Sequence, residues 1–295
     1  MIIFNRIQEL ENHLNIARND HKTVGFVPTM GALHEGHLAL VRKSKAETDL
    51  TVCSIFVNPT QFNDPRDLEK YPRTLENDSK LLETVDCDVI FAPEALEMYT
   101  AEELENKLKG IDDRSWTAGK TVDFGQLDKV MEGAQRPGHF NGVAQVVSKL
   151  FRAVKPDKAY FGQKDFQQLA IVRSMTQQLG FAIDIIGCPI IRESDGLAMS
   201  SRNVRLKPNE RAVAPLISKT LLKVQEMADR HSVYELKGFA KAQIKSERLM
   251  KLEYFEIADA DTLQPVDSLD ESRSVVACIA LKLGEIRLID NIILK

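Results

Sequence analysis

The chain has 295 residues, of which 43% are hydrophobic and 28% are charged. These values are ordinary for a globular protein, and the length suffices for one large or two modest domains. The formal net charge is only −4, with both signs interspersed, so no overall basic field exists to attract nucleic acid or an anionic membrane. Any positive charge that serves a function must therefore be local.

The N-terminus and the cysteines predict a cytoplasmic protein. MIIFNRIQELENHL has only a four-residue apolar run and lacks the features of a signal peptide. No apolar run reaches the length of about 18 residues that a transmembrane helix requires. Buried free thiols are predicted rather than disulfides or a zinc site, because the cysteines lie far apart and form no Cys-x-x-Cys pair. They are Cys53, Cys87, Cys188 and Cys278.

From the N-terminus to about residue 186, helix-like and strand-like segments alternate. Apolar residues at helical spacing predict helices at 7–17, 38–47, 75–85, 142–154 and 166–179. Apolar runs predict strands at 23–27, 50–57, 87–92, 158–161 and 181–186. This alternation indicates an α/β fold with a Rossmann-like, doubly wound parallel sheet covered on both faces by helices.

The pattern changes beyond residue 187. Two long helical stretches, 208–229 and 233–250, precede three strand-like segments, YFEIADA, SVVACIALKL and IRLIDNIIL. This is the order of a smaller α+β domain. We therefore predict a Rossmann-like catalytic domain over 1–187 and a C-terminal domain over 188–295. The polar, irregular stretch at 100–125 is assigned to no element.

Residues Pro28 to Gly36 follow the first strand of the predicted sheet, where ligands bind in open parallel sheets. Gly31 and Gly36 permit close backbone approach or positive φ, and the N–H groups that begin the next helix suit a phosphate. A histidine in this place can donate to a phosphate oxygen and stabilise charge that develops during transfer. His34 and His37 therefore indicate a phosphate-handling turn.

The sequence HEGH is not interpreted as a zinc signature. Its histidines are three residues apart, whereas His-Glu-x-x-His requires four, and no third ligand lies nearby in the sequence. The remaining histidines at 13, 21 and 231 have no comparable context and are interpreted as structural or surface residues.

Two polar stretches are predicted to lie near that turn. In IFVNPTQF, Asn58 and Gln61 follow the second strand, where their amides can bind hydroxyls and carboxylates. An ordinary Asn-Pro turn is an equal alternative for this stretch. In GAQRPGHFNGVAQVV, Arg136 and His139 lie in a loop before a helix, where the arginine can hold an anion bidentately.

Two further stretches carry donors. In FGQKDFQQL, Lys164 lies at the mouth of a helix after a parallel strand, Asp165 is a candidate N-cap, and Gln168 lies one turn further on. A solvated lysine is the alternative there. In DGLAMSSRN, Met199 can pack against a flat base, and the following residues offer donors to a triphosphate. These are Ser200, Ser201 and Arg202.

Together these stretches resemble the pantoate–β-alanine ligase (pantothenate synthetase) family. PTMGALHEGH, NPTQF, RPGHF, FGQKDFQQL and DGLAMSSRN occur in order between residues 23 and 205. More distantly, the two-histidine turn and the Ser-Ser-Arg loop are similar to signatures of the nucleotidyltransferase superfamily. The resemblance implies ATP-dependent joining of (R)-pantoate to β-alanine through a pantoyl-adenylate, with release of pyrophosphate and AMP. This is the last step in making pantothenate, the precursor of coenzyme A.

The resemblance also implies roles for individual residues. Catalytic roles fall to His37, the family's proton donor, and to His34, Lys164, Ser200 and Arg202. ATP is implied to contact Met30, Gly31, Ala32, Leu33, His34, Glu35, Gly36, His37, Gly162, Gln163, Lys164, Asp165, Ile191, Met199, Ser200, Ser201 and Arg202. Pantoate is implied to contact Gln61 and Gln168, and β-alanine to contact Gln61, with Asn58, Arg136 and His139 in supporting positions.

One position departs from the family's pattern, because Gln163 stands where a glutamate is expected. The change removes a charge beside the phosphates but leaves Lys164 and Asp165 in place. The family also implies Mg²⁺ with ATP, a homodimer, and small-molecule substrates without nucleic acid or membrane. After YPRT the acidic residues are Glu76 and Asp78, and no protein ligand for Mg²⁺ is assigned. The C-terminal domain is expected to close as a lid that shields the adenylate from water.

Two alternatives stay open at this point. A nucleotidyltransferase acting on a phosphorylated acceptor would release pyrophosphate but form no amide. A regulatory protein that only binds nucleotide would show no pantoate-dependent release of pyrophosphate.

Overall fold

The computed structural model describes residues 1–61, 68–69, 71–108, 117 and 122–295. These fall into two compact units. Unit 1 comprises Met1–Phe124, Arg136–Gly162 and Ile171–Cys188, and unit 2 comprises Gly125–Gln135, Gln163–Ala170 and Pro189–Lys295. Unit 2 thus includes two segments that precede residue 188 in the sequence. The domains 1–187 and 188–295 stay a prediction, because compactness is not a test of independent folding.

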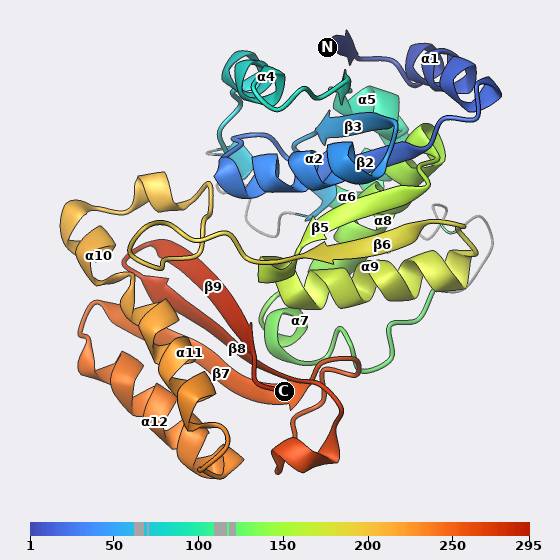
Figure 1. The fold of residues 1–295 in the computed structure, drawn as a ribbon. Coiled ribbons are helices and arrows are strands. Elements are labelled where there is room, and N and C mark those ends of the chain that lie inside the picture. Colours follow the sequence, from blue (N-terminus) through green and yellow to red (C-terminus); the bar gives the residue numbers. More distant parts are fainter. Residues whose placement is uncertain (62–67, 70, 109–116, 118–121) are drawn as a thin grey trace. The chain divides into compact units, whose positions relative to one another are not determined.

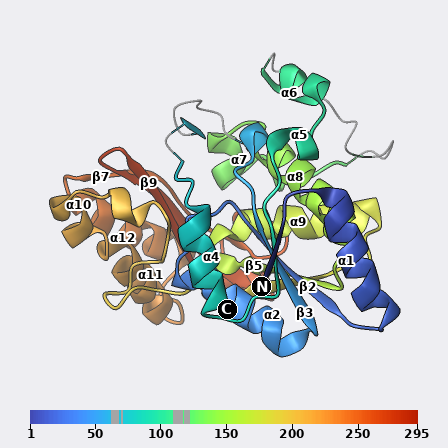
Figure 2. The same ribbon diagram turned by 90° about the horizontal axis from the view of Figure 1, so that it is seen from above.

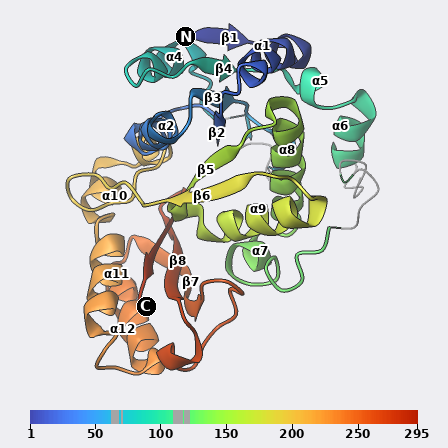
Figure 3. The ribbon, with the colours of Figure 1, turned by 45° about the vertical axis from the view of Figure 1, so that its right-hand side comes forward.

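Unit 1 is built on a six-stranded sheet in which every pairing is parallel. Figure 3 shows its strands in the order β1-β4-β3-β2-β5-β6. Their bounds are β1 Ile2–Phe4, β2 Val24–Thr29, β3 Leu50–Ile55, β4 Val89–Phe91, β5 Lys158–Gly162 and β6 Asp184–Cys188. The order reverses between β2 and β5, so the carboxyl ends of these two strands form the switch point where open sheets bind ligands.

Helices cover both faces of this sheet. On one face α2 (Glu35–Glu47) and α4 (Leu75–Glu83) pack through leucines against Val27 and Ile90. On the other, Phe151 of α8 (His139–Val154) packs edge-on against Phe26, and α1 (Ile7–Asn19) lies beside α8. Figure 2 shows α1 and α2 on opposite sides of β2 and β3. Short helices α5 (Ala95–Met98) and α6 (Ala101–Leu108) follow β4.

Unit 2 has a three-stranded antiparallel sheet in the order β7-β8-β9. Its strands are Met250–Asp259, Val275–Leu283 and Ile286–Ile293, and α12 (Val233–Ser246) and α11 (Leu216–Met227) pack on it (Figure 1). The core between them is apolar, with Leu221, Leu236 and Ile279 almost fully buried. Unit 2 also contains α10 (Pro208–Val213), α7 (Met131–Gln135) and the start of α9 (Phe166–Leu179), which continues into unit 1.

The predicted fold class is confirmed, but several elements differ from the sequence-based prediction. The helix predicted over 233–250 ends at Ser246, and β7 already begins at Met250. The apolar run at the N-terminus forms β1, a strand too short to be recognised as one. The single helix predicted over 208–229 is two helices, because Pro215 has no backbone N–H to continue α10. Strand β6 starts only at Asp184, later than the apolar pattern indicated. No helix in the described ranges is both long and apolar enough to cross a membrane.

Candidate active site

The turn after β2 is held by a carboxylate from α4. Gly31 and Ala32 both have positive φ, at 80° and 49°. Asp78, only 1% exposed, accepts the backbone N–H of Ala32 at 3.0 Å and of Leu33 at 2.8 Å. Thr74 donates its hydroxyl to the same carboxylate at 3.1 Å. In the sequence, Asp78 stood out only as one of two acidic residues after YPRT, and its anchoring contact with the turn was not predicted.

The spacing of the two histidines is that of a helix capping box. His34 is the N-cap of α2 and accepts the N–H of Gly36 on Nδ1 at 3.1 Å, while His37 at the third helical position accepts the N–H of His34 on Nδ1 at 3.3 Å. The two rings lie 4.1 Å apart between centroids. A neutral imidazole that accepts on Nδ1 carries its proton on Nε2. Both histidines therefore present an N–H donor at the positive end of a helix.

The loop after β3 is organised by a buried amide. Asn58 is 1% exposed; its Oδ1 accepts hydroxyls from Tyr99 at 2.8 Å and Thr60 at 3.1 Å, and its Nδ2 donates to Gln61 Oε1 at 3.2 Å. Burial raises the pKa of Tyr99, which keeps the phenol a donor. Gln61 in turn donates from Nε2 to the sulfur of Met30 at 2.7 Å. Asn58 thus orients Gln61 through protein contacts.

His139 and Arg136 lie against the same loop. His139 Nδ1 lies 3.0 Å from the carbonyl of Gln61, and its Nε2 lies 3.0 Å from Arg136 Nη1. Because guanidinium is only a donor, Nε2 accepts and the proton is on Nδ1. Gly142, one turn into α8, permits this approach: a Cβ there would lie 2.5 Å from the carbonyl oxygen of Thr60. Unit 1 therefore assembles the turn, the amide loop and this Arg-His pair around the end of β2.

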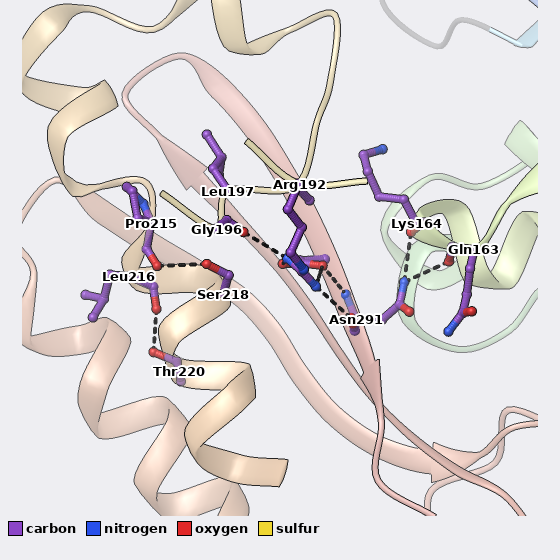
Figure 4. A network of polar contacts seen from close by, with 12 residues as sticks. Gln163, Lys164, Arg192, Gly196, Leu197, Pro215, Leu216, Ser218, Thr220 and Asn291 are labelled. Atoms are coloured by element: carbon purple, nitrogen blue, oxygen red, sulfur yellow. Dashed lines mark hydrogen bonds and ion pairs between the residues drawn. The ribbon is translucent and has the colours of Figure 1, made fainter. Parts of the chain in front are cut away.

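Unit 2 carries the Lys164 turn. The segment Gln163–Asp165 forms a 3-10 turn, η3, directly before α9, with Lys164 Nζ 3.2 Å from Asp165 Oδ2. Asn291 of β9 donates to the carbonyls of Gln163 and Lys164 at 2.9 and 3.0 Å (Figure 4). Gln168 is partly exposed, whereas Gln167 is 4% exposed and accepts the N–H of Glu132 at 2.9 Å.

The Ser-Ser-Arg stretch follows a hairpin in the same unit. The N–H of Met199 donates to the carbonyl of Ile191 at 3.0 Å, which closes the hairpin. Beyond it, the N–H of Arg202 donates to the hydroxyl of Ser200 at 3.3 Å. Asn203, 7% exposed, donates to Glu193 Oε1 at 2.7 Å and to the carbonyl of Ala198 at 3.1 Å. These contacts fix the loop that carries Ser200, Ser201 and Arg202.

The predicted site residues are therefore divided between the units. Unit 1 contains Met30 to His37, Asn58, Gln61, Arg136, His139 and Gly162. Unit 2 contains Gln163 to Gln168, Ile191 and Met199 to Arg202. Within the described ranges, no group of three or more His, Cys, Asp or Glu side chains is arranged to hold a metal ion. The carboxylate of Asp78 accepts two backbone N–H groups and so serves as an anchor of the turn.

Comparison with known proteins identifies the family. The sequence model described as "Pantoate-beta-alanine ligase" matches residues 2–293. The chain belongs to the pantoate–β-alanine ligase family. This ligase is 51% identical over 292 residues to the pantothenate synthetase of Bacteroides fragilis, covering 99% of this chain and 98% of the relative. The relative in Porphyromonas gingivalis is 48% identical over 292 residues, covering 99% of each chain.

Solved structures agree with this assignment. Pantothenate synthetase from Thermus thermophilus superposes on this ligase with a TM-score of 0.88 at 40% identity, covering 99% of each chain. Pantoate-beta-alanine ligase from Francisella tularensis, complexed with "Beta-gamma ATP and Beta-alanine", gives a TM-score of 0.73 at 32% identity and covers 99% of this chain and 97% of its own. The resemblance found in the sequence is confirmed. Membership of this family excludes the two alternatives, which were a nucleotidyltransferase that acts on a phosphorylated acceptor and a regulatory protein that only binds nucleotide.

Proposed function

We propose that this ligase uses the two-histidine turn, Lys164 and the Ser-Ser-Arg loop to stabilise the phosphates of ATP during formation of an acyl-adenylate. The enzyme condenses (R)-pantoate with β-alanine to give pantothenate, AMP and pyrophosphate, the last step of pantothenate biosynthesis. The observation that carries the assignment of roles is the capping box of His34 and His37, which presents two Nε2 donors where α2 begins.

The chemistry explains why such donors are needed. A carboxylate is a poor acylating agent, so one of its oxygens must become part of a leaving group. Attack of the pantoate carboxylate on the α-phosphorus of ATP forms the mixed anhydride and releases pyrophosphate. This step brings two anions together, and preorganised donors and cations offset the repulsion and stabilise the departing charge. The amine of β-alanine then attacks the acyl carbon, the amide C–N bond forms as the acyl C–O bond of the anhydride breaks, and AMP and one proton of the amine leave.

The predicted site residues have distinct roles in this scheme. In unit 1, His37 acts as proton donor, His34 contacts the phosphates, and Gln61, oriented by Asn58, binds pantoate and borders β-alanine. Arg136 and His139 support that loop. In unit 2, Lys164, Ser200 and Arg202 bind the phosphates, Gln168 binds pantoate, and Ile191 and Met199 contact the adenine. Holding the two substrates in line raises their effective concentration, which lowers the activation barrier by on the order of several kcal/mol.

Mg²⁺ enters this scheme with ATP. It would be held by ATP itself, and we name no protein ligand, because no group of three or more His, Cys, Asp or Glu side chains in the described ranges is arranged to hold a metal ion. Bound there, Mg²⁺ supplies neutralisation of phosphate charge.

We also propose that the enzyme acts in the cytoplasm as a homodimer and that residues 188–295 close over the adenylate as a lid. The four cysteines, all buried free thiols, support the cytoplasmic assignment, because reducing compartments keep thiols free. Sedimentation that shows a monomer would end the proposal of a dimer. Small-angle scattering without compaction on adding ATP and pantoate, together with unprotected amides at 190–205, would end the proposal of a lid.

The deciding assay for the function is pyrophosphate release from Mg-ATP with pantoate, with and without β-alanine, and product identification by mass. Sustained release that needs both substrates, with AMP and pantothenate accumulating, is the expected result. Release that ignores pantoate, or ATP binding without release, would overturn the assignment of the acceptor.

A further inference from the structure

Strand β9 carries two neighbouring polar side chains that are almost fully buried. Asp290 is 3% and Asn291 2% exposed. Burial of polar groups is costly unless they are hydrogen-bonded. Successive side chains of a strand point to opposite faces of the sheet, so this pair can reach different segments of the chain. Neither residue was singled out in the sequence.

Asn291 holds the turn that carries Lys164. Its Nδ2 donates one hydrogen bond to the carbonyl of Gln163 and one to the carbonyl of Lys164, at 2.9 and 3.0 Å (Figure 4). An amide nitrogen has two hydrogens, so both are used on this turn. The donor stands on a strand paired with β8 on one side, with Asn291 opposite Cys278. The backbone of Lys164 is thereby fixed to a sheet.

Asp290 holds the hairpin that precedes the Ser-Ser-Arg loop. Its carboxylate forms a two-point ion pair with Arg192, with oxygen-to-nitrogen distances of 2.7 and 3.1 Å. Arg192 also donates to the carbonyl of Gly196 at 3.1 Å, which bridges the hairpin (Figure 4). Burial raises the pKa of Asp290, and the Arg192 guanidinium opposes that shift. Because the N–H of Asn291 donates to Asp290 Oδ1 at 2.8 Å, the two anchors are also joined directly.

We infer that Asp290 and Asn291 are positioning residues that hold Lys164 and the Ser-Ser-Arg loop in one fixed arrangement for the phosphates of ATP. This inference rests on the proposed phosphate role of Lys164. The Lys164 turn and the hairpin before the Ser-Ser-Arg loop are separate segments of the sequence, and adjacent residues of β9 hold both of them. Neither positioning residue touches the reacting atoms; each acts through the segment that it holds. A displacement of about 1 Å in such a group costs up to ~100-fold in rate.

The primary test removes the two donors of Asn291. Asn291→Leu has a similar size without donors, and Asn291→Asp keeps the shape without them. Gln225→Leu is the matched control, because Gln225 donates to the carbonyl of Ile293 at 2.7 Å on the same strand. Single-turnover pyrophosphate release should fall about 10- to 100-fold in both Asn291 variants and stay near the original rate in the control. Circular dichroism and melting curves establish that each variant is folded.

A double-mutant cycle separates positioning from a general structural defect. If Asn291 acts through Lys164, adding Asn291→Leu to Lys164→Ala should slow the reaction little further. If the rate losses of the two single variants multiply in the double variant, the inference is overturned. It is also overturned if Asn291→Leu releases pyrophosphate as fast as Gln225→Leu while Lys164→Ala is slow. A normal rate in Lys164→Ala would instead remove the proposed role of that lysine. If Asn291→Leu does not fold, the cycle of Asp290→Asn with Arg202→Ala decides on the same criteria.

Discussion

The turn after β2 and the turn after β5 differ in how they are fixed. The first is held partly by local contacts, because its two histidines cap α2. In addition, Asp78 of α4 accepts the backbone N–H groups of Ala32 and Leu33. The second is η3, whose backbone is held by a side chain 127 residues further along the chain. A turn of the first kind is recognisable from a short motif. The scaffold of the second is visible only in the folded structure.

The largest expected effect comes from removing the acting groups of the two turns. Lys164→Ala and His37→Ala should each slow adenylate formation by about 100- to 1000-fold, because each removes a preorganised donor from developing charge. Single-turnover pyrophosphate release measures this rate. His37 also takes part in the capping box, so His37→Ala should lower the melting temperature, whereas Lys164→Ala should not. Normal rates in either variant would remove that residue from the mechanism.

Breaking the anchor of the first turn should lower stability. Asp78→Asn keeps the shape but turns an amide NH₂ toward backbone N–H groups, leaving a buried donor without an acceptor. The expected loss in free energy of unfolding, measured by urea denaturation, is about 1–3 kcal/mol. Steady-state kinetics should show a higher KM for ATP. Glu76→Gln on the same helix is the control, because Glu76 forms an exposed ion pair with Lys80. Equal midpoints for the two variants would contradict the anchoring role.

A smaller effect is expected from the backbone of the same turn. Gly31 has φ of 80°, and a Cβ there would lie 3.0 Å from Asp78 Oδ2 and 3.1 Å from Ile55 Cγ2. Gly31→Ala should therefore destabilise the protein by about 1–2 kcal/mol. Gly238→Ala, within α12 and with nothing within 4 Å of its Cβ position, should instead stabilise it by about 0.5–1 kcal/mol. Thermal unfolding measures the change in stability of both variants. If Gly31→Ala left the stability unchanged, the turn would tolerate an L-residue.

The same contrast explains how far the sequence predicted the molecule. Alternating apolar strands and amphipathic helices were enough for the parallel sheet, because its periodicity is local. The motif around His34 indicated a phosphate turn, but the reason for its spacing, a capping box, required coordinates. Asp78, Asp290 and Asn291 were not predicted as anchors because a buried carboxylate or amide has no sequence signal apart from the partner it meets. In the sequence the C-terminal strands are ordinary apolar runs, although one of them, β9, holds the Lys164 turn through Asn291.

The smallest effect is expected at the edge of the Ser-Ser-Arg hairpin, where the contacts are partly exposed. Arg211 pairs with Asp195 at 2.5 Å and with Glu193 at 2.6 Å. Its hydrogen bond is the main cause that lowers the pKa of Asp195.

Because the folded pKa of Asp195 lies below its unfolded value of about 3.9, the contribution of Asp195 to stability is complete above that pH and is lost as the pH falls through the folded pKa. Arg211→Gln should therefore cost less than ~1 kcal/mol at pH 7, after allowance for solvent screening, and less still near pH 3. Urea denaturation at the two pH values measures the difference. A loss that is equal at both pH values would show that Arg211 stabilises the hairpin by packing of its alkyl chain and not by charge. Arg211 would then differ from Arg192, which pairs with the buried carboxylate of Asp290.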